Sequence, residues 1–235
     1  MVALCVALLF IGFVLADMLV RKLEARPAAA LNLAVNLAAP YQMASKSLGP
    51  LADWPAIPEG VYLSKGHTWL SPQAEGVFLA GADALVSRAL GAVSKVILPR
   101  VEQEVWTGSP LFQLDLGGRI LTVPSPVTGR VVSVNRQLQD RPELVAQAPY
   151  GDGWVCELLP TRLAQEKTAL RAGEKARAWL EREMDRLAEF LGAWVPANPA
   201  LGTTSLDGGA VVPGALRGFD AEIWRAFEHE FLSPK

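Results

Sequence analysis

The chain has 235 residues, of which 51% are apolar and 20% charged, a composition that excludes both a disordered tail and a polytopic membrane protein. Its 22 basic and 24 acidic residues give a net charge of −2, so no general basic field favours binding to nucleic acid. Two cysteines and two histidines are too few for a disulfide framework or a structural zinc site, and we expect no metal.

The N-terminal segment is the most apolar part of the chain. Apart from Asp17, residues 1–20 carry no charged side chain. About 20 helical residues span the roughly 30 Å of a bilayer core, so we expect residues 1–22 to be a transmembrane anchor. Arg21 and Lys22 follow the apolar run, which places the C-terminal bulk in the cytoplasm, on a bacterial-type inner membrane. A signal peptide and a buried helix are the alternatives.

Residues 23–58 are rich in Ala, Leu and Pro and carry few charges. We expect a short helix between Pro27 and Pro40, followed by an irregular connector. An apolar segment beside a membrane covers either lipid or a partner subunit, and the sequence leaves both open.

Residues 59–160 contain short runs of Val, Leu and Ile separated by Gly and Pro, which predict a compact β-sandwich or barrel. The runs expected to be strands are VYLS, TWLS, GVFLAG, SKVILP, PLFQLDL, RILTVPS and GRVVSVN. Gly117 and Gly118 lie between two of these runs and predict a tight hairpin turn. Helical spacing over residues 81–90 predicts one helix inside the block.

Several short motifs occur in a fixed order within this block. They are Gly66-His67-Thr68-Trp69, Ala89-Leu90-Gly91, Val96-Ile97-Leu98-Pro99, Ser125-Pro126-Val127-Thr128-Gly129, Pro142-Glu143-Leu144-Val145 and Pro149-Tyr150-Gly151-Asp152-Gly153-Trp154. In order and spacing they resemble the glycine cleavage system H proteins, lipoyl carriers that shuttle an aminomethyl group between enzymes. The resemblance implies a mainly β fold with helical additions, a barrel-sandwich hybrid with a lipoyl lysine on a hairpin tip.

The resemblance also locates that lysine, eleven residues before the glycine matched by Gly129, and the residue there is Gly118. Arg119 is no substitute, because a guanidinium stays protonated. Lys95 is expected on a strand, as a solvated side chain. The scaffold therefore lacks its acyl acceptor, and we expect a non-lipoylated protein without a cofactor and without enzymatic activity.

His67 and Cys156 are the remaining candidates for chemistry. We expect His67 to make a structural hydrogen bond, since no nucleophile can be paired with it from the sequence. We expect Cys156 to be a small buried hydrophobe on the closing strand, because no basic residue flanks it to lower its pKa.

Residues 161–195 are charged and predict amphipathic helices with a break at Ala172-Gly173. One apolar stripe follows the second helix, at Leu180, Met184, Leu187 and Leu191, with Trp179 and Phe190 beside it. Packing on the chain's own barrel is favoured over a partner's groove, because a terminal helix normally covers the domain it follows.

Residues 196–218 predict a flexible connector, and residues 219–235 an aromatic helix. A tethered aromatic helix is typical of a docking element, so we expect its aromatic side to bind a partner, with folding back on the domain as the alternative. The docking residues are Phe219, Ile223, Trp224, Phe227 and Phe231.

Together these features predict an accessory scaffold subunit of a membrane complex, which docks through its anchor, its juxtamembrane segment and its C-terminal tail. Two alternatives stay open: a working lipoyl carrier, and a periplasmic adaptor of the membrane-fusion type. Such adaptors usually have a long helical hairpin between the two halves of the lipoyl-like domain. Here the halves are contiguous from Phe112 to Val134, which disfavours the adaptor.

Overall fold

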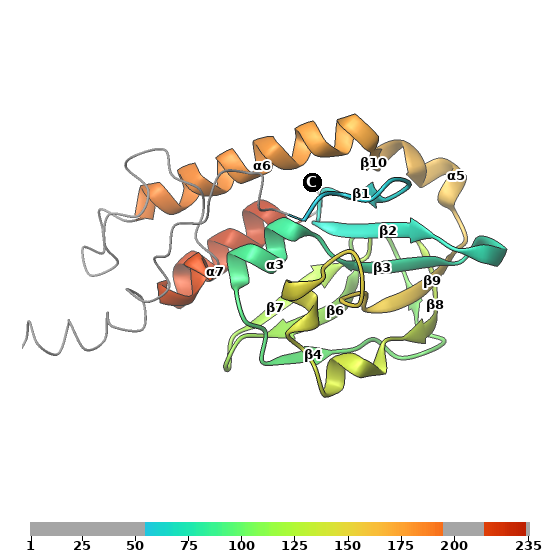
Figure 1. The fold of residues 1–235 in the computed structure, drawn as a ribbon, viewed down its shortest axis with the longest axis horizontal. Helices are drawn as coiled ribbons and strands as arrows, with labels where there is room; N and C mark the ends of the chain where they lie inside the picture. The colour runs from blue at the N-terminus through green and yellow to red at the C-terminus, as the bar shows by residue number, and fades with distance from the viewer. Residues whose placement is uncertain (1–54, 195–213, 234–235) are drawn as a thin grey trace, which may run out of the picture. The chain divides into compact units, whose positions relative to one another are not determined.

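The computed structural model describes residues 55–194 and 214–233 (Figure 1). This part of the chain is mainly β, with helices around two sheets, as expected. The expected anchor at residues 1–22 and almost all of the juxtamembrane segment lie outside the described residues. Within the described ranges, no helix is both long enough and apolar enough to cross a membrane.

The larger sheet has seven strands in the order β10-β1-β2-β3-β9-β8-β5, and the smaller one has three in the order β4-β6-β7. All strand pairs are antiparallel. The bounds are β1 (Tyr62–Leu63), β2 (Thr68–Pro72), β3 (Phe78–Ala82), β4 (Lys95–Ile97), β5 (Glu104–Val105), β6 (Pro110–Asp115), β7 (Ile120–Pro124), β8 (Gly129–Val134), β9 (Cys156–Pro160) and β10 (Arg171–Ala172). Every run expected to be a strand contains one. The sequence pattern missed β5 and β10, which have only two residues each.

The helices are α3 (Ala84–Leu90), α4 (Leu144–Gln147), α5 (Leu163–Glu166), α6 (Gly173–Trp194) and α7 (Ala221–Phe227). Short helical turns are η2 (Ala74–Gly76), η3 (Arg136–Gln139), η4 (Lys167–Ala169), η6 (Ala215–Gly218) and η7 (Glu228–Leu232). The helix expected over residues 81–90 begins later than predicted, because Gly81 and Ala82 belong to β3. Asp83 then caps α3, its Oδ1 accepting hydrogen bonds from the backbone N–H groups of Leu85 and Val86.

Trp69 lies at the centre of the core, fully buried on β2. Its cross-strand partner on β3 is Gly81. A Cβ atom at Gly81 would lie 2.9 Å from the indole Nε1, so any larger residue would collide with the ring. Tyr150 closes the other side, with its ring centre 6.0 Å from that of Trp69. These contacts explain why the motifs contain a fully buried tryptophan and a tyrosine that is half-buried against it.

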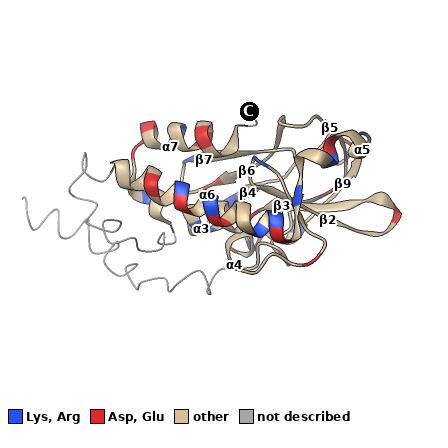
Figure 2. Ribbon diagram, turned by 90° about the horizontal axis from the view of Figure 1, so that it is seen from above, with Lys and Arg blue, Asp and Glu red and all other residues tan. Residues whose placement is uncertain are grey.

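Helix α6 lies along the domain as a long rod above β1 and β2 (Figure 1). Its apolar stripe is buried, at Trp179, Leu180, Met184, Leu187, Phe190 and Leu191. Acidic and basic residues are interspersed along the helix (Figure 2). Packing on the chain's own domain, the favoured alternative, is therefore what the structure shows. The break expected at Ala172-Gly173 is also found, since α6 begins at Gly173.

The C-terminal segment, residues 214–233, folds back on the domain. The rings of Phe227 and Phe231 have their centres 6.5 and 5.6 Å from that of Phe190 on α6. All of the expected docking residues are at most 6% exposed, namely Phe219, Ile223, Trp224, Phe227 and Phe231. The structure thus differs from the expected docking role, because α6 and β7 already cover this aromatic side.

The expected connector is also shorter than residues 196–218. Residues 215–218 form η6, and Leu216 is fully buried. Gly214 approaches Gly91 so closely that a Cβ atom on Gly91 would lie 2.7 Å from the Gly214 Cα. The C-terminal segment is therefore attached to the domain from Gly214 onward, while residues 195–213 lie outside the described residues.

Candidate functional site

The hairpin between β6 and β7 is the candidate site, because it contains the position at which the resemblance implies a lysine. The backbone N–H of Leu116 donates a 2.9 Å hydrogen bond to the carbonyl oxygen of Arg119. Between them Gly117 and Gly118 have φ values of +77° and +95°, in the region that favours glycine. The expected two-glycine turn is confirmed.

Two polar side chains hold this turn in place. The Asp115 carboxylate accepts a 2.7 Å hydrogen bond from the N–H of Gly118. The Ser94 hydroxyl accepts one from the N–H of Gly117 at 2.9 Å and donates one to the Asp115 carbonyl at 2.7 Å. A Cβ atom on either glycine would meet nothing within 4 Å. The tip is therefore an ordered, open turn whose two residues offer no side chain to acylate.

Arg119 follows the two glycines and contacts the C-terminal segment. Its guanidinium donates a hydrogen bond to the carbonyl oxygen of Phe219 and lies 5.6 Å from the ring centre of Trp224. Further along β7, the Thr122 N–H donates a 3.2 Å hydrogen bond to Glu228 Oε1. The outer edge of β7 is thus covered by the chain's own tail.

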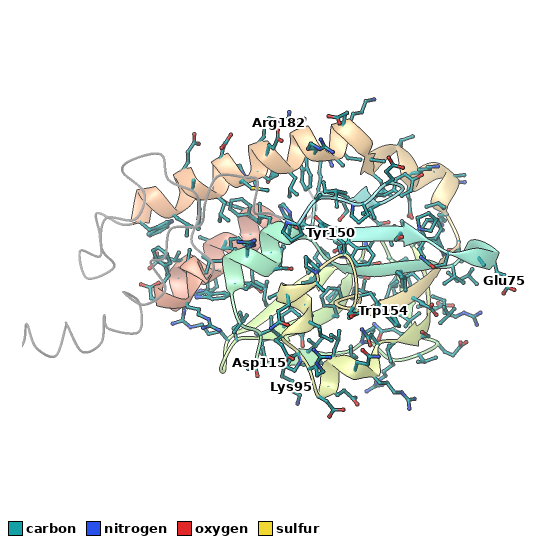
Figure 3. All side chains as sticks on the ribbon, in the orientation of Figure 1. Glu75, Lys95, Asp115, Tyr150, Trp154 and Arg182 are labelled. Atoms are coloured by element: carbon teal, nitrogen blue, oxygen red, sulfur yellow. The ribbon has the colours of Figure 1, made fainter. Side chains whose placement is uncertain are left out.

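Lys95 is paired in register with Asp115 across β4 and β6, and its side chain is exposed. Figure 3 shows the two residues side by side at the rim of the smaller sheet. This matches the expectation of a solvated lysine on a strand. Lys95 is therefore near the base of the hairpin but does not supply an amine at its tip.

His67 belongs to a second polar cluster, which is buried. Its Nδ1 lies 2.8 Å from Asp83 Oδ2, and its Nε2 lies 3.6 Å from Glu183 Oε2. Asp83 also binds the backbone of His67, because the His67 carbonyl oxygen accepts a 2.9 Å hydrogen bond from the Asp83 N–H. His67 has a φ of +58°, which is uncommon for a residue other than glycine. The expected structural hydrogen bond is confirmed. The sequence did not indicate Glu183, because that residue lies far along the chain on α6.

The two carboxylates keep His67 charged. Burial by itself lowers the pKa of His67, but Asp83 and Glu183 outweigh it and raise the pKa to about 9. Burial would raise the pKa of Glu183, yet hydrogen bonding and the charge of His67, with help from Arg186, bring it below its usual value. At neutral pH the cluster is an imidazolium between two carboxylates, which ties the start of β2 to α6.

Arg186 extends this cluster to the C-terminal segment. Its guanidinium lies 3.1 Å from Glu183 Oε2, donates a 2.8 Å hydrogen bond to the Glu230 carbonyl and sits 4.2 Å from the ring centre of Phe231. The ionic groups from His67 to Arg186 are thus engaged with one another. The arrangement connects the larger sheet, α6 and the C-terminal segment.

Cys156 is fully buried in β9, and burial, with the nearby charge of Glu157, raises the pKa of its thiol. It is the small hydrophobe that the sequence predicts. Among the described residues, no cluster of three or more His, Cys, Asp or Glu side chains could hold a metal ion.

Comparison with known proteins supplies the family. Residues 61–183, just over half of the chain, match the family model described as glycine cleavage H-protein. The chain belongs to the glycine cleavage H-protein family. The match contains both the hairpin and the His67 cluster, and it ends within α6. The C-terminal segment therefore lies beyond the region that defines the family.

Two individual relatives in sequence agree with this assignment. A probable glycine cleavage system H protein of Pyrococcus abyssi is 33% identical over 125 residues, which are 53% of this chain and 92% of that protein. A glycine cleavage system H protein of Magnetococcus marinus is 35% identical over 126 residues, covering 54% of this chain and 89% of the relative. The crystal structure of a glycine cleavage system H protein from Mycobacterium marinum aligns at 26% identity with a TM-score of 0.45, covering 54% and 98% of the two chains.

Proposed function

We propose that this H-protein family member is a non-catalytic, non-lipoylated accessory subunit of a membrane complex. The observation that carries the proposal is the glycine at position 118, where the family resemblance implies the lipoyl lysine. Lipoylation forms an amide between the carboxyl group of lipoate and a lysine Nζ, and a glycine offers no such nitrogen.

The geometry of the hairpin supports the same function. The turn is well formed and held by Asp115 and Ser94, so the scaffold is intact without its reactive group. Arg119, which follows Gly118, binds the tail through Phe219 and Trp224. A hairpin that binds the tail stabilises the chain's own structure. This structural use of the hairpin is compatible with a role in binding other subunits.

Attachment to a membrane is part of the proposal and rests on the sequence. The apolar run in residues 1–20 and the basic residues after it favour one span with the domain on the cytoplasmic side. A reporter fused after Lys235 should be active in the cytoplasm. Activity confined to the periplasm would contradict this orientation and favour the periplasmic adaptor.

The lipoyl state is tested by intact-mass spectrometry of the full chain from a lipoate-replete host, before and after incubation with lipoate, ATP and a lipoate ligase. A lipoylated H protein serves as the positive control. We expect the mass of the unmodified chain in both samples. A gain equal to one lipoyl group would contradict the proposal.

A lipoyl-dependent aminomethyl carrier is the second candidate, and the names of the relatives favour it. Such a carrier needs an exposed lysine near the hairpin, and Lys95 in register with Asp115 is the lysine on the smaller sheet. If a mass gain is seen, the Lys95→Arg variant should lose it, while a Lys175→Arg control on α6 should keep it.

The accessory role requires partners, which we expect to be other subunits of the complex. Purification in mild detergent followed by mass spectrometry should find the same chains at constant ratio. A chain that purifies alone as a monomer would remove the support for a scaffold.

A further inference from the structure

Strand β7 is the last strand of the smaller sheet, and its outer edge faces the C-terminal segment. In an antiparallel pair, alternate residues point their backbone groups away from the neighbouring strand. The hydrogen bond from Leu116 to Arg119 closes the β6–β7 hairpin and sets this alternation. Ile120 and Thr122 are therefore the residues of β7 whose N–H and C=O groups point outward. Such groups can bind a further strand unless something covers them.

The C-terminal segment covers this edge at Thr122. The Thr122 N–H donates a 3.2 Å hydrogen bond to Glu228 Oε1, and η7 contacts β7. At the other end of the strand the domain protects itself, because the Pro124 carbonyl accepts a 2.6 Å hydrogen bond from the Thr68 hydroxyl and a proline has no N–H. The edge from Ile120 to Thr122 thus depends on the segment, whereas Pro124 is covered from within the domain.

Strand β7 has the composition of a strand that pairs readily once it is uncovered. Its five residues include no charged side chain, and both Ile120 and Thr122 are β-branched. Ile120 is 52% exposed even with the segment docked. Edge strands usually resist association through charge, short length or a cover. Since β7 is neither charged nor very short, its protection is the cover.

The C-terminal segment is an addition to the domain. It lies beyond residues 61–183, the region that the family model matches. Side chains attach it near both ends: Arg217 donates a 2.6 Å hydrogen bond to the Ala92 carbonyl, and Arg186 donates one to the Glu230 carbonyl at 2.8 Å. The buried Trp224 indole N–H finds no acceptor among the described residues. A buried donor without an acceptor costs free energy, so docking is less favourable than the buried area alone implies.

We propose that the C-terminal segment is an autoinhibitory cover of an edge through which two copies of this chain associate. While the segment is docked, β7 cannot pair. When the segment is displaced, β7 pairs antiparallel with β7 of a second copy, centred on Leu121. This register places Ile120 of each copy opposite Thr122 of the other, so that outward-pointing backbone groups bond to one another and β-branched side chains face each other.

A second copy suits this edge because the strand is self-complementary. It has no charge that would attract an oppositely charged segment or repel an identical strand. The inference goes beyond the proposed accessory function and supplies a means of regulating it. A subunit that binds the aromatic side of the C-terminal segment would uncover β7, so binding and self-association would be coupled. That consequence rests on the proposed function, whereas the cover itself does not.

The test displaces the segment without altering the domain. Phe227→Asp places a carboxylate on the fully buried side of α7, which disfavours docking on either copy and so also prevents exchange of segments between copies. Ala221→Asp adds a carboxylate on the exposed side of the same helix and is the matched control. Hydrogen exchange across residues 221–232 should become faster in Phe227→Asp and stay unchanged in the control, because a displaced short helix is marginally stable.

Sedimentation velocity of the full chain in micelles of an uncharged detergent measures the association. We expect Phe227→Asp to associate at least about tenfold more tightly than the parent chain or Ala221→Asp. Adding Thr122→Pro to Phe227→Asp should abolish this gain, since proline removes an outward N–H and leaves the pairing with β6 intact. Thr122→Lys in the same background should act likewise through charge, without restricting the backbone. Circular dichroism verifies that each variant is folded.

Three results would overturn the inference. Unchanged exchange across residues 221–232 of Phe227→Asp would show that the segment is not a separable cover. A displaced segment without a gain in association would show that β7 does not pair. Association that survives both Thr122 substitutions would assign the contact to another uncovered surface, such as the apolar stripe of α6. None of these outcomes depends on the lipoyl state, so a mass gain would refute the proposed function and leave this measurement intact.

Discussion

The two edges of the β4-β6-β7 sheet are protected by different means. At β7 the protection comes from residues about a hundred positions away, since Arg119 holds Phe219 and Glu228 accepts the Thr122 N–H. At β4 it comes from η3, which contacts this three-residue strand. The β7 edge is covered by the aromatic tail, and the β4 edge by a short helical turn whose Leu138 is fully buried. The covered edge at β7 therefore depends on a segment beyond the region matched by the family model, whereas the β4 edge is covered from within that region.

The strongest way to break the covered edge is to remove Phe227. The ring is fully buried, with its centre 5.0 Å from that of Phe231. We expect Phe227→Ala to lower the free energy of unfolding by about 4 kcal/mol, through lost apolar burial and the cavity left behind. Chemical denaturation of the full chain measures this change.

The control for Phe227→Ala is Val101→Ala, because the valine side chain is 47% exposed. We expect that substitution to change the free energy of unfolding by less than about 0.5 kcal/mol. If both variants had equally small effects, the tail would not be packed on β7 and α6, and its aromatic side would again be available to a partner.

The ionic cluster behind the covered edge is tested by His67→Asn. Asparagine tolerates the positive φ at this position, so the variant removes the ring charge with little backbone strain. The increase in the pKa from 6.5 to about 9 corresponds to roughly 3 kcal/mol of stabilisation at low pH. We expect a loss of that order at pH 6 in thermal or chemical unfolding.

The same variant has a characteristic pH dependence. Because the folded-state pKa lies above the unfolded value, the stabilisation is fully present below about pH 6.5 and is lost as the pH rises through 9. The stability difference between the parent chain and His67→Asn should therefore shrink between pH 7 and pH 10. A difference that stays constant over this range would show that the ring acts only through packing.

A smaller effect is expected at the contact between hairpin and tail. Arg119→Ala removes the hydrogen bond to the Phe219 carbonyl and the contact with Trp224, for a loss of about 1 to 2 kcal/mol. Hydrogen exchange at the Thr122 amide should become faster. The control is Arg130→Ala, which breaks an exposed ion pair with Glu102 and should leave that amide unchanged.

The smallest effect is expected at the hairpin tip, which lies at the end of the sheet between the two edges. Gly118→Lys should cost about 1 kcal/mol, because φ is +95° and a new Cβ meets no neighbour. The variant places an amine at the family position. Intact-mass analysis after incubation with lipoate, ATP and a lipoate ligase should show modification of the variant and none of the parent chain. Modification of both chains would indicate that another lysine is the acceptor, and Lys95 would be the first candidate.

Much of the two-sheet domain could be predicted from the sequence, because its signals are local. Alternating apolar runs located the main strands, and two adjacent glycines located the turn that Gly117 and Gly118 make. Strands of two residues, such as β5 and β10, carry too little pattern to be recognised. The absence of an amine at position 118 was also evident, since it needs only the count from Gly129.

By itself the sequence determined the family motifs and the glycine at position 118, where the family resemblance implies a lysine. It also determined that the aromatic tail must bury one side. It did not determine what that side is buried against, because an apolar face is equally satisfied by a partner or by its own domain. Only the tertiary structure placed Phe227 against Phe190, joined Glu183 to His67, and brought η3 against β4. Periodicity and turn chemistry act between neighbours in the chain, whereas these contacts depend on which distant surfaces the fold brings together.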